Sequence, residues 1–275
     1  MREPSAEEDS AENVVSLTPE QAIANLRSPD LSLRYYAAWW LGKFRVRLPD
    51  AVDALIAALE DEADKTELGG YPLRRNAARA LGKLGNTKAV PGLIQCLECS
   101  DFYVREAAAQ SLEMLRAVDA APALMQLLDG GVAAGVQVPG RPHLTQPYEA
   151  VIEALGAIAE SKATSLIQPF IEHPVPRVKC AANRAMYQLT HEPVYGEYLV
   201  KMLDSSDLSL RRVVLSDLGA IGYLAAANAI AEATVENSFK LIALKGLLEN
   251  QLSMELDESL SDDAIRVINL MDSLL

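Results

Sequence analysis

A nine-residue pattern, made of one polar residue followed by mostly small and apolar residues, recurs along the chain. It begins at an anchor that is usually arginine, and an aliphatic residue follows seven positions later. The anchors are Arg34, Arg74, Arg105, Tyr148, Lys179 and Arg211, and the aliphatic positions are Leu41, Leu81, Leu112, Leu155, Met186 and Leu218. The aliphatic positions lie 40, 31, 43, 31 and 32 residues apart. This spacing predicts a repeat of about 31 residues that carries two insertions.

A second apolar stretch with helical spacing lies between successive copies of the pattern, for example "AVDALIAALED" and "AAPALMQLLDG". Each repeat is therefore predicted to contain two antiparallel helices. One such pair cannot bury its apolar face alone, whereas stacked pairs form a continuous core. We predict an all-α fold, an α-solenoid of HEAT-like helical hairpins wound as a right-handed superhelix. The composition, 50% hydrophobic but only 5% aromatic, also suits closely packed helices better than sheets.

Three repeats carry an aspartate four residues before the anchor arginine, as the HEAT pattern requires. The pairs are Asp30 with Arg34, Asp101 with Arg105, and Asp207 with Arg211. We expect each aspartate to cap the next helix, and each arginine to bind an aspartate of the neighbouring repeat. The pairs are interpreted as a stacking ladder without a catalytic role.

The helix that follows the aspartate turn lines the concave side in HEAT-like repeats. Positions one and five residues after the anchor share one face of this helix, and most of them are polar or charged. They include Tyr35, Trp39, Arg75, Arg79, Glu106, Glu149 and Glu153. Positions six residues after the anchor are mostly small, so we expect them to pack between helices, with Trp40 as the large exception.

The aromatic side chains of the first repeat permit two interpretations. Tyr35 and Trp39 occupy positions where other repeats carry charged residues. Either the N-terminal segment 17–26 covers them as a structural cap, or they form the wall of a binding groove or partner interface, where Trp and Tyr are enriched.

The two insertions, at about 60–73 and 129–147, contain glycine and proline and differ from the repeat helices. Inserted loops often collect on the binding side of a solenoid. Gly69-Gly70 predicts a turn that places Tyr71 at the groove rim. His143 in the second loop is either a ligand contact or a solvent-facing histidine without a role in binding. The repeat domain is expected over 17–275, with an atypical C-terminal cap from about 233 and an acidic, disordered tail at 1–16.

Charge and cysteine content narrow the function classes. A formal charge of −13 and a pI near 4.7 argue against nucleic-acid binding. The polar, acidic start predicts no signal peptide, and no apolar run is long enough to span a membrane, so we expect a cytoplasmic protein. Cys96, Cys99 and Cys180 are an odd number of thiols, expected to stay reduced. The "CLEC" and His191-Glu192 pairs have too few partners for a metal site, so no metal is predicted.

Three segments give the chain a more specific resemblance: "YYAAWWLGKFRV" (35–46), "ELGGYPLRRNAARALGKLG" (67–85) and "LECSDFYVREAAAQSLEML" (97–115). They resemble the E/F-type phycobilin lyases, most closely the E-type, or alpha, subunits. That resemblance implies a heterodimer with an F-type subunit and, as substrates, phycocyanobilin and the phycocyanin alpha subunit. It also implies addition of an acceptor cysteine to the bilin's ethylidene double bond, with no permanently bound cofactor. The reacting thiol would belong to the acceptor.

The repeat register then assigns roles for such a reaction. We expect Tyr35 and Trp39 to stack on the bilin, and Arg75 or Arg79 to bind its propionates, with Tyr71 and His143 as further contacts. Glu106, Glu149 or Glu153 would bind the pyrrole nitrogens and support protonation. The alternatives are a non-catalytic scaffold or bilin carrier, and a lyase relative that also isomerises the bilin.

Overall fold

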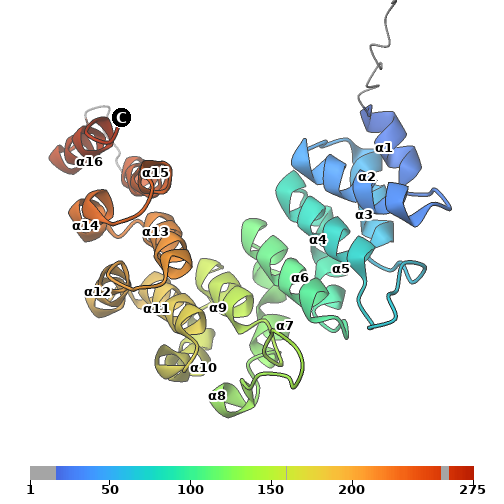
Figure 1. Ribbon diagram of the computed structural model, residues 1–275, viewed down its shortest axis with the longest axis horizontal. Helices are drawn as coiled ribbons and strands as arrows, with labels where there is room; N and C mark the ends of the chain where they lie inside the picture. The colour runs from blue at the N-terminus through green and yellow to red at the C-terminus, as the bar shows by residue number, and fades with distance from the viewer. Residues whose placement is uncertain (1–16, 159, 255–259) are drawn as a thin grey trace, which may run out of the picture.

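The structure is a computed structural model that describes residues 17–158, 160–254 and 260–275; the expected N-terminal tail lies outside them. The described residues form helices arranged in two curved layers, and their one β-bridge joins Gln137 to Leu144. The inner layer contains α2 (Leu31–Lys43), α4 (Pro72–Leu84), α6 (Phe102–Met114), α9 (Tyr148–Ala157), α11 (Pro176–Thr190), α13 (Leu208–Ile221) and α15 (Asn237–Met254). Each inner helix packs against the next one in the chain. The predicted α-solenoid is confirmed (Figure 1).

The outer layer consists of shorter helices. It contains α1 (Pro19–Asn25), α3 (Pro49–Ala58), α5 (Val90–Cys96), α7 (Ala121–Gln126), α10 (Thr164–Ile167) with η4 (Gln168–Glu172), α12 (Pro193–Met202), α14 (Ala227–Glu232) and α16 (Asp262–Asp272). Single 3₁₀ turns, η1 (Thr87–Ala89), η2 (Val118–Ala120), η3 (Ser161–Ala163) and η5 (Leu224–Ala226), precede α5, α7, α10 and α14. The helix that follows each aspartate turn therefore lines the concave side, as the register predicts (Figure 1).

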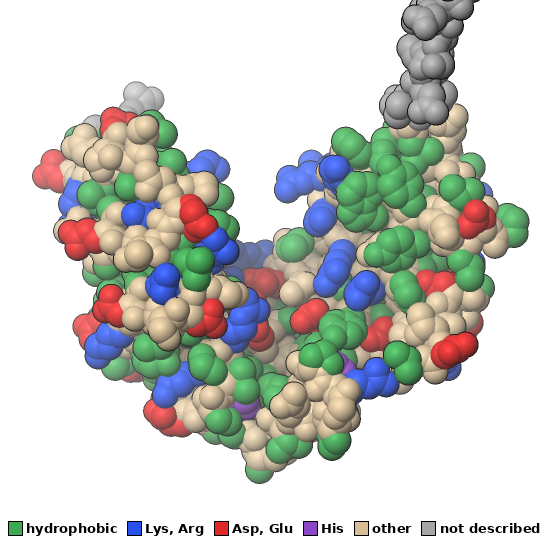
Figure 2. Space-filling model, in the orientation of Figure 1, with side chains coloured by type: hydrophobic (Ala, Val, Ile, Leu, Met, Phe, Trp, Pro, Cys, Tyr) green, Lys and Arg blue, Asp and Glu red, His purple; other side chains and the backbone are tan. Residues whose placement is uncertain are grey.

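The curvature leaves a wide opening between the N-terminal and the C-terminal helices of the solenoid. Figure 2 shows this hollowed face, with Lys and Arg side chains along its inner walls. None of the helices in the described part of the chain is both long and apolar enough to cross a membrane.

Close contacts between neighbouring inner helices depend on small residues. The aliphatic repeat positions are almost completely buried, and the residue after several of them is glycine. A Cβ atom on Gly82 would lie 2.8 Å from the Cα of Ser111, and one on Gly156 would lie 2.6 Å from the Cα of Ala185. Since backbone atoms cannot move aside cheaply, these glycines set how closely the helices approach.

We expect Gly156→Ala to lower the free energy of unfolding by about 1–3 kcal/mol, because overpacking forces the α9–α11 contact apart. Gly92→Ala in α5 is the matched control, since its Cβ would meet only the flexible end of Leu59 at 2.9 Å. The control is expected to be neutral or to gain up to about 1 kcal/mol from helix propensity. Urea unfolding followed by circular dichroism measures both, and equal midpoints for the two variants would contradict the explanation.

The aspartate caps are confirmed, but the predicted ladder is wrong for two of the three arginines. Asp30, Asp101 and Asp207 accept backbone N–H bonds at the starts of α2, α6 and α13. Arg34 does pair with a carboxylate of the next repeat, Asp61. Arg105 instead donates to the carbonyl oxygens of Cys99 and Thr145, and Arg211 to those of Ser205 and Thr234. Cys99, Ser205 and Thr234 follow the ends of outer helices, and Thr145 lies in the second insertion, so free carbonyl oxygens at these places compete for the guanidinium groups.

The two insertions meet beside the N-terminus of α6. In the first, Gly69 has the predicted turn geometry, with φ +81°. The second contains the short α8 (Gly131–Ala134) and a hairpin-like loop, whose Arg141 Nη2 donates to the carbonyl oxygen of Leu68 at 3.4 Å. At the other end of the chain, α15 continues the inner layer and α16 packs on α14 and α15.

Candidate functional site

The N-terminal wall of the concave face is aromatic. Trp39 is 40% exposed, and the rings of Tyr36 and Trp39 lie 5.4 Å apart. Trp40 faces the other way, packed against the core and 4.7 Å from the ring of Phe44. The adjacent tryptophans therefore face different surroundings, as the register predicts. Tyr35 is also exposed, so α1 packs on α2 without covering this wall.

Basic side chains follow this aromatic wall. Lys43 Nζ lies 4.6 Å from the Trp39 ring centroid, and the Arg75 guanidinium lies 5.7 Å from that of Tyr103. Arg79 lies 3.7 Å from the carboxylate of Glu106 on the next inner helix. Sequence reasoning found the two arginines but not Tyr36 or Lys43, although both are on the same helix as Trp39.

The predicted carboxylates lie next in order, on α6 and α9. Glu149 is 3.5 Å from Arg177, and Glu153 is 3.4 Å from Arg184. Burial raises the pKa of Glu106 and Glu149 above the usual glutamate value, and raises that of Glu153 well above it. A glutamate with a raised pKa keeps its proton to a higher pH and can donate it to a ligand. The three carboxylates can thus serve as acids or hydrogen-bond partners.

Arg184 lies at the centre of a charge cluster that also contains Glu113, Glu153 and Asp217, here called the Arg184 cluster. Its guanidinium lies 2.5 Å from Glu113, 3.4 Å from Glu153 and 3.3 Å from Asp217. The members come from α6, α9, α11 and α13, so the cluster joins four successive inner helices. Burial raises the pKa of Asp217 to about 6. Arg184 stands five residues after the anchor Lys179, a groove position, and Asp217 stands six residues after the anchor Arg211, a position between helices, but the sequence pattern assigns neither a function.

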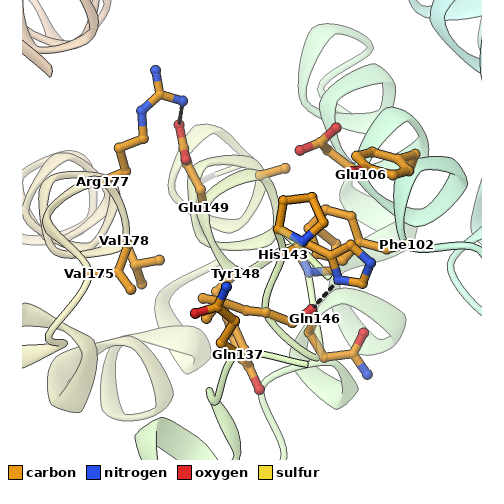
Figure 3. A pocket seen from close by; sticks show the side chains of 15 residues that line it. Phe102, Glu106, Gln137, His143, Gln146, Tyr148, Glu149, Val175, Arg177 and Val178 are labelled. Carbon is orange, nitrogen blue, oxygen red and sulfur yellow. Dashed lines mark hydrogen bonds and ion pairs between the residues drawn. The ribbon is translucent and has the colours of Figure 1, made fainter. Parts of the chain in front are cut away.

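His143 stands beside a cavity of about 390 Å³ between the second insertion and helices α6, α9 and α11. Its ring stacks on Phe102, with centroids 4.3 Å apart and planes 12° apart. Figure 3 shows this stack on one side of the cavity and the Glu149–Arg177 pair on the other. The structure therefore brings His143 to the same cavity as Glu106 and Glu149. The sequence pattern does not single out Phe102, because this residue precedes the anchor Arg105 and lies outside the register positions that mark the groove.

Tyr71 is predicted to contact a ligand, but its side chain is buried. Its side chain is only 5% exposed, at the residue that precedes α4. The Arg74 guanidinium lies 4.2 Å from its ring centroid and Lys65 Nζ lies 5.3 Å from it. The expectation that Tyr71 presents its ring at the groove rim is wrong, because these two cations pack over it.

Two of the three cysteines are not placed for covalent chemistry. Cys96 and Cys180 are buried, and burial raises the pKa of each thiol to about 12. Thiols with such a pKa are protonated at neutral pH and are poor nucleophiles. Neither Cys96 nor Cys180 is therefore suited to form a thioether, and the half-buried Cys99 follows the outer-layer helix α5.

Comparison with known proteins identifies relatives over the whole chain. Residues 33–61 match a family model described as PBS lyase HEAT-like repeat, and residues 71–137 match one described as HEAT repeats. The chain is 77% identical to the phycocyanobilin lyase subunit alpha of Nostoc sp., with all of both chains covered. It is 59% identical to the protein of that name from Microchaete diplosiphon, over 94% of this chain and 90% of the other.

A solved structure shares the same architecture. The complex of CpcE and CpcF of phycocyanin lyase from Nostoc sp. PCC7120 contains a chain 77% identical to this one. The two superpose with a TM-score of 0.91, covering 99% of this chain and 100% of the other.

Proposed function

The chain belongs to the family of phycocyanobilin lyase alpha subunits, and on this premise we propose that its concave face holds phycocyanobilin while a cysteine of the phycocyanin alpha subunit is joined to it. The observation that carries the proposal is the order of side chains along the inner helices. Aromatic rings on α2 are followed by arginines on α4 and by carboxyl groups on α6 and α9. A linear tetrapyrrole presents a conjugated plane, two propionates and pyrrole nitrogens, which match these three groups.

Each group has a defined task in this proposal. Trp39, with Tyr35 and Tyr36, stacks on the bilin plane, and Arg75 and Arg79 bind propionates. Glu106 and Glu149 accept hydrogen bonds from pyrrole N–H groups, while the Phe102–His143 stack bounds the cavity that receives one end of the bilin. Holding the ethylidene carbon beside the incoming thiol converts a bimolecular encounter into an oriented reaction.

The partner and the acceptor supply the remaining parts. A relative with 77% identity was solved as a complex with CpcF, and this supports an F-type subunit as the partner of this chain. The buried, protonated thiols of Cys96 and Cys180 support an acceptor cysteine as the nucleophile. The two chains together would enclose the bilin and present its reactive end to phycocyanin.

Co-expression of this chain with an F-type subunit, phycocyanobilin synthesis and the apo-phycocyanin alpha subunit tests the function. We expect a red-absorbing covalent adduct, seen as zinc-enhanced fluorescence on a denaturing gel, that requires this chain and the acceptor cysteine. Equal adduct formation without the chain would refute the proposal. Stable bilin or phycocyanin binding without an adduct would identify a carrier or scaffold, and a shifted adduct spectrum would identify an isomerising lyase.

A further inference from the structure

The Arg184 cluster contains more negative than positive charge. Three carboxylates surround one guanidinium, and arginine stays protonated in proteins. If all three carboxyl groups were ionised, the cluster would carry a net charge of −2 in a site where the Arg184 side chain is only 12% exposed. Like charges that share a buried site disfavour one another's ionised form, so this excess of carboxyl groups favours a proton on the cluster.

Unpartnered atoms point to the same conclusion. Asp217 is 2% exposed, and its Oδ2 atom has no hydrogen-bond partner among the described residues. The Nε atom of Arg184 also lacks a partner there. Buried, ionised groups with unpartnered atoms are costly, and a proton held on one carboxyl group of the cluster lowers this cost. Asp217 and Glu153 contact the same nitrogen, Arg184 Nη1, at 3.3 and 3.4 Å, so a negative charge on Asp217 lies close enough to favour a proton on Glu153.

Of the two carboxyl groups that contact Arg184 Nη1, that of Glu153 is the more exposed on the concave face. The side chain of Glu153 is 14% exposed, compared with 3% for Asp217. Glu153 lies one helical turn after Glu149, which lines the cavity in Figure 3. A proton held by the buried members can therefore be passed to the groove by Glu153.

We propose that Glu153 is the general acid that protonates the bilin, and that two positioning residues serve it: the negative charge of Asp217 favours a proton on Glu153, and Arg184 holds the two carboxyl groups beside each other. The proposal rests on the lyase function proposed above. It assigns roles to two residues, Arg184 and Asp217, whose charges otherwise serve only to join neighbouring repeats.

The proton balance of the addition is complete without another reactant. Sulfur of the acceptor cysteine bonds to the outer ethylidene carbon, and the π electron pair moves into the ring system. Glu153 supplies the proton that completes the new C–H bond, and the thiol proton returns to the emptied carboxylate. The net change is addition of S–H across C=C, and nothing is oxidised or reduced.

The test is the pH dependence of bilin transfer by the heterodimer, measured from pH 6 to 9. We expect the Asp61→Asn control to show the same pH profile as the wild type, so that the ratio of the two rates does not depend on pH. Asp61 is the matched control because it forms a similarly buried ion pair with Arg34 away from the cluster. Asp217→Asn removes one negative neighbour, so Glu153 loses its proton more easily and the high-pH loss of activity moves down by roughly one pH unit.

Glu153→Gln is expected to slow transfer by roughly 10²-fold while bilin absorption still shows binding, and Glu153→Asp should recover part of the rate. Either a wild-type rate for Glu153→Gln or a wild-type pH profile for Asp217→Asn would overturn the inference. Thermal unfolding of each variant separates these outcomes from loss of fold. Failure of the wild-type heterodimer to form any adduct would instead refute the proposed function.

Discussion

Replacing Arg184 with methionine is expected to lower the free energy of unfolding by about 3–5 kcal/mol at pH 8, because it leaves three clustered carboxylates without their cation. The loss should come from the uncompensated buried charge rather than from the packing of the side chain, since methionine has a similar apolar length. Urea unfolding of the purified chain at pH 5, 6.5 and 8 measures it.

The pH dependence of this loss follows from the direction of the shifts. Glu153 and Asp217 have a higher pKa in the folded state than in the unfolded state, that of Asp217 being about 6. The folded protein therefore binds more protons, and the contribution of these groups to stability falls as the pH rises from about 4 through their folded pKa values. The cost of Arg184→Met should be smallest at pH 5 and largest at pH 8.

Arg184→Lys is the matched variant for charge. It keeps the positive charge but loses the planar fork that contacts three carboxylates, so we expect an intermediate loss. Equal stability of Arg184→Met and wild type at pH 8, or a loss that is the same at every pH, would contradict the charge account of the cluster.

Removing one member of the aromatic wall and one arginine together should severely weaken bilin binding. Trp39→Ala with Arg79→Ala removes a stacking contact, worth about 0.5–1.5 kcal/mol, and a charge-assisted hydrogen bond, worth about 1.5–3 kcal/mol. The combined loss of about 2–4.5 kcal/mol corresponds to a roughly 30- to 2000-fold rise in the Kd of the heterodimer for phycocyanobilin. An absorption titration measures this Kd.

A control pair on the outer layer separates groove contacts from general damage. Lys88 and Val118 are exposed on η1 and η2, and replacing both with alanine removes a cation and an apolar side chain away from the inner helices. The control should bind the bilin like the wild type. If the groove variant and this control bind equally well, the bilin does not lie against α2 and α4.

The sequence predicts the scaffold well because its information is local and periodic. Leu41, Leu81 and Leu112 recur at the spacing of the repeat, and each is fully buried in the structure. The same register separates Trp39 from Trp40, since helical geometry alone decides which of two neighbours faces the groove. These predictions need no knowledge of how distant segments meet.

Features that depend on distant segments could not be predicted in this way. The Arg184 cluster combines Glu113 with Arg184, 71 positions later, and Glu113 lies outside the register positions that mark the groove. The Phe102–His143 stack depends on the path of a loop without repeat periodicity. Tyr71 was misplaced for the same reason, because Lys65 and Arg74 cover its ring only once the first insertion has folded.

The central claim, that the bilin lies against the aromatic wall of the concave face, is tested most directly by fluorine NMR. The chain contains only two tryptophans, Trp39 and Trp40. Labelling this chain alone with 5-fluorotryptophan, in complex with an unlabelled F-type subunit, gives two resonances that Trp39→Phe and Trp40→Phe assign. Saturation with phycocyanobilin should shift the Trp39 resonance strongly and that of Trp40 only slightly. If the absorption spectrum shows that the bilin is bound but the Trp39 resonance does not move, the account is contradicted.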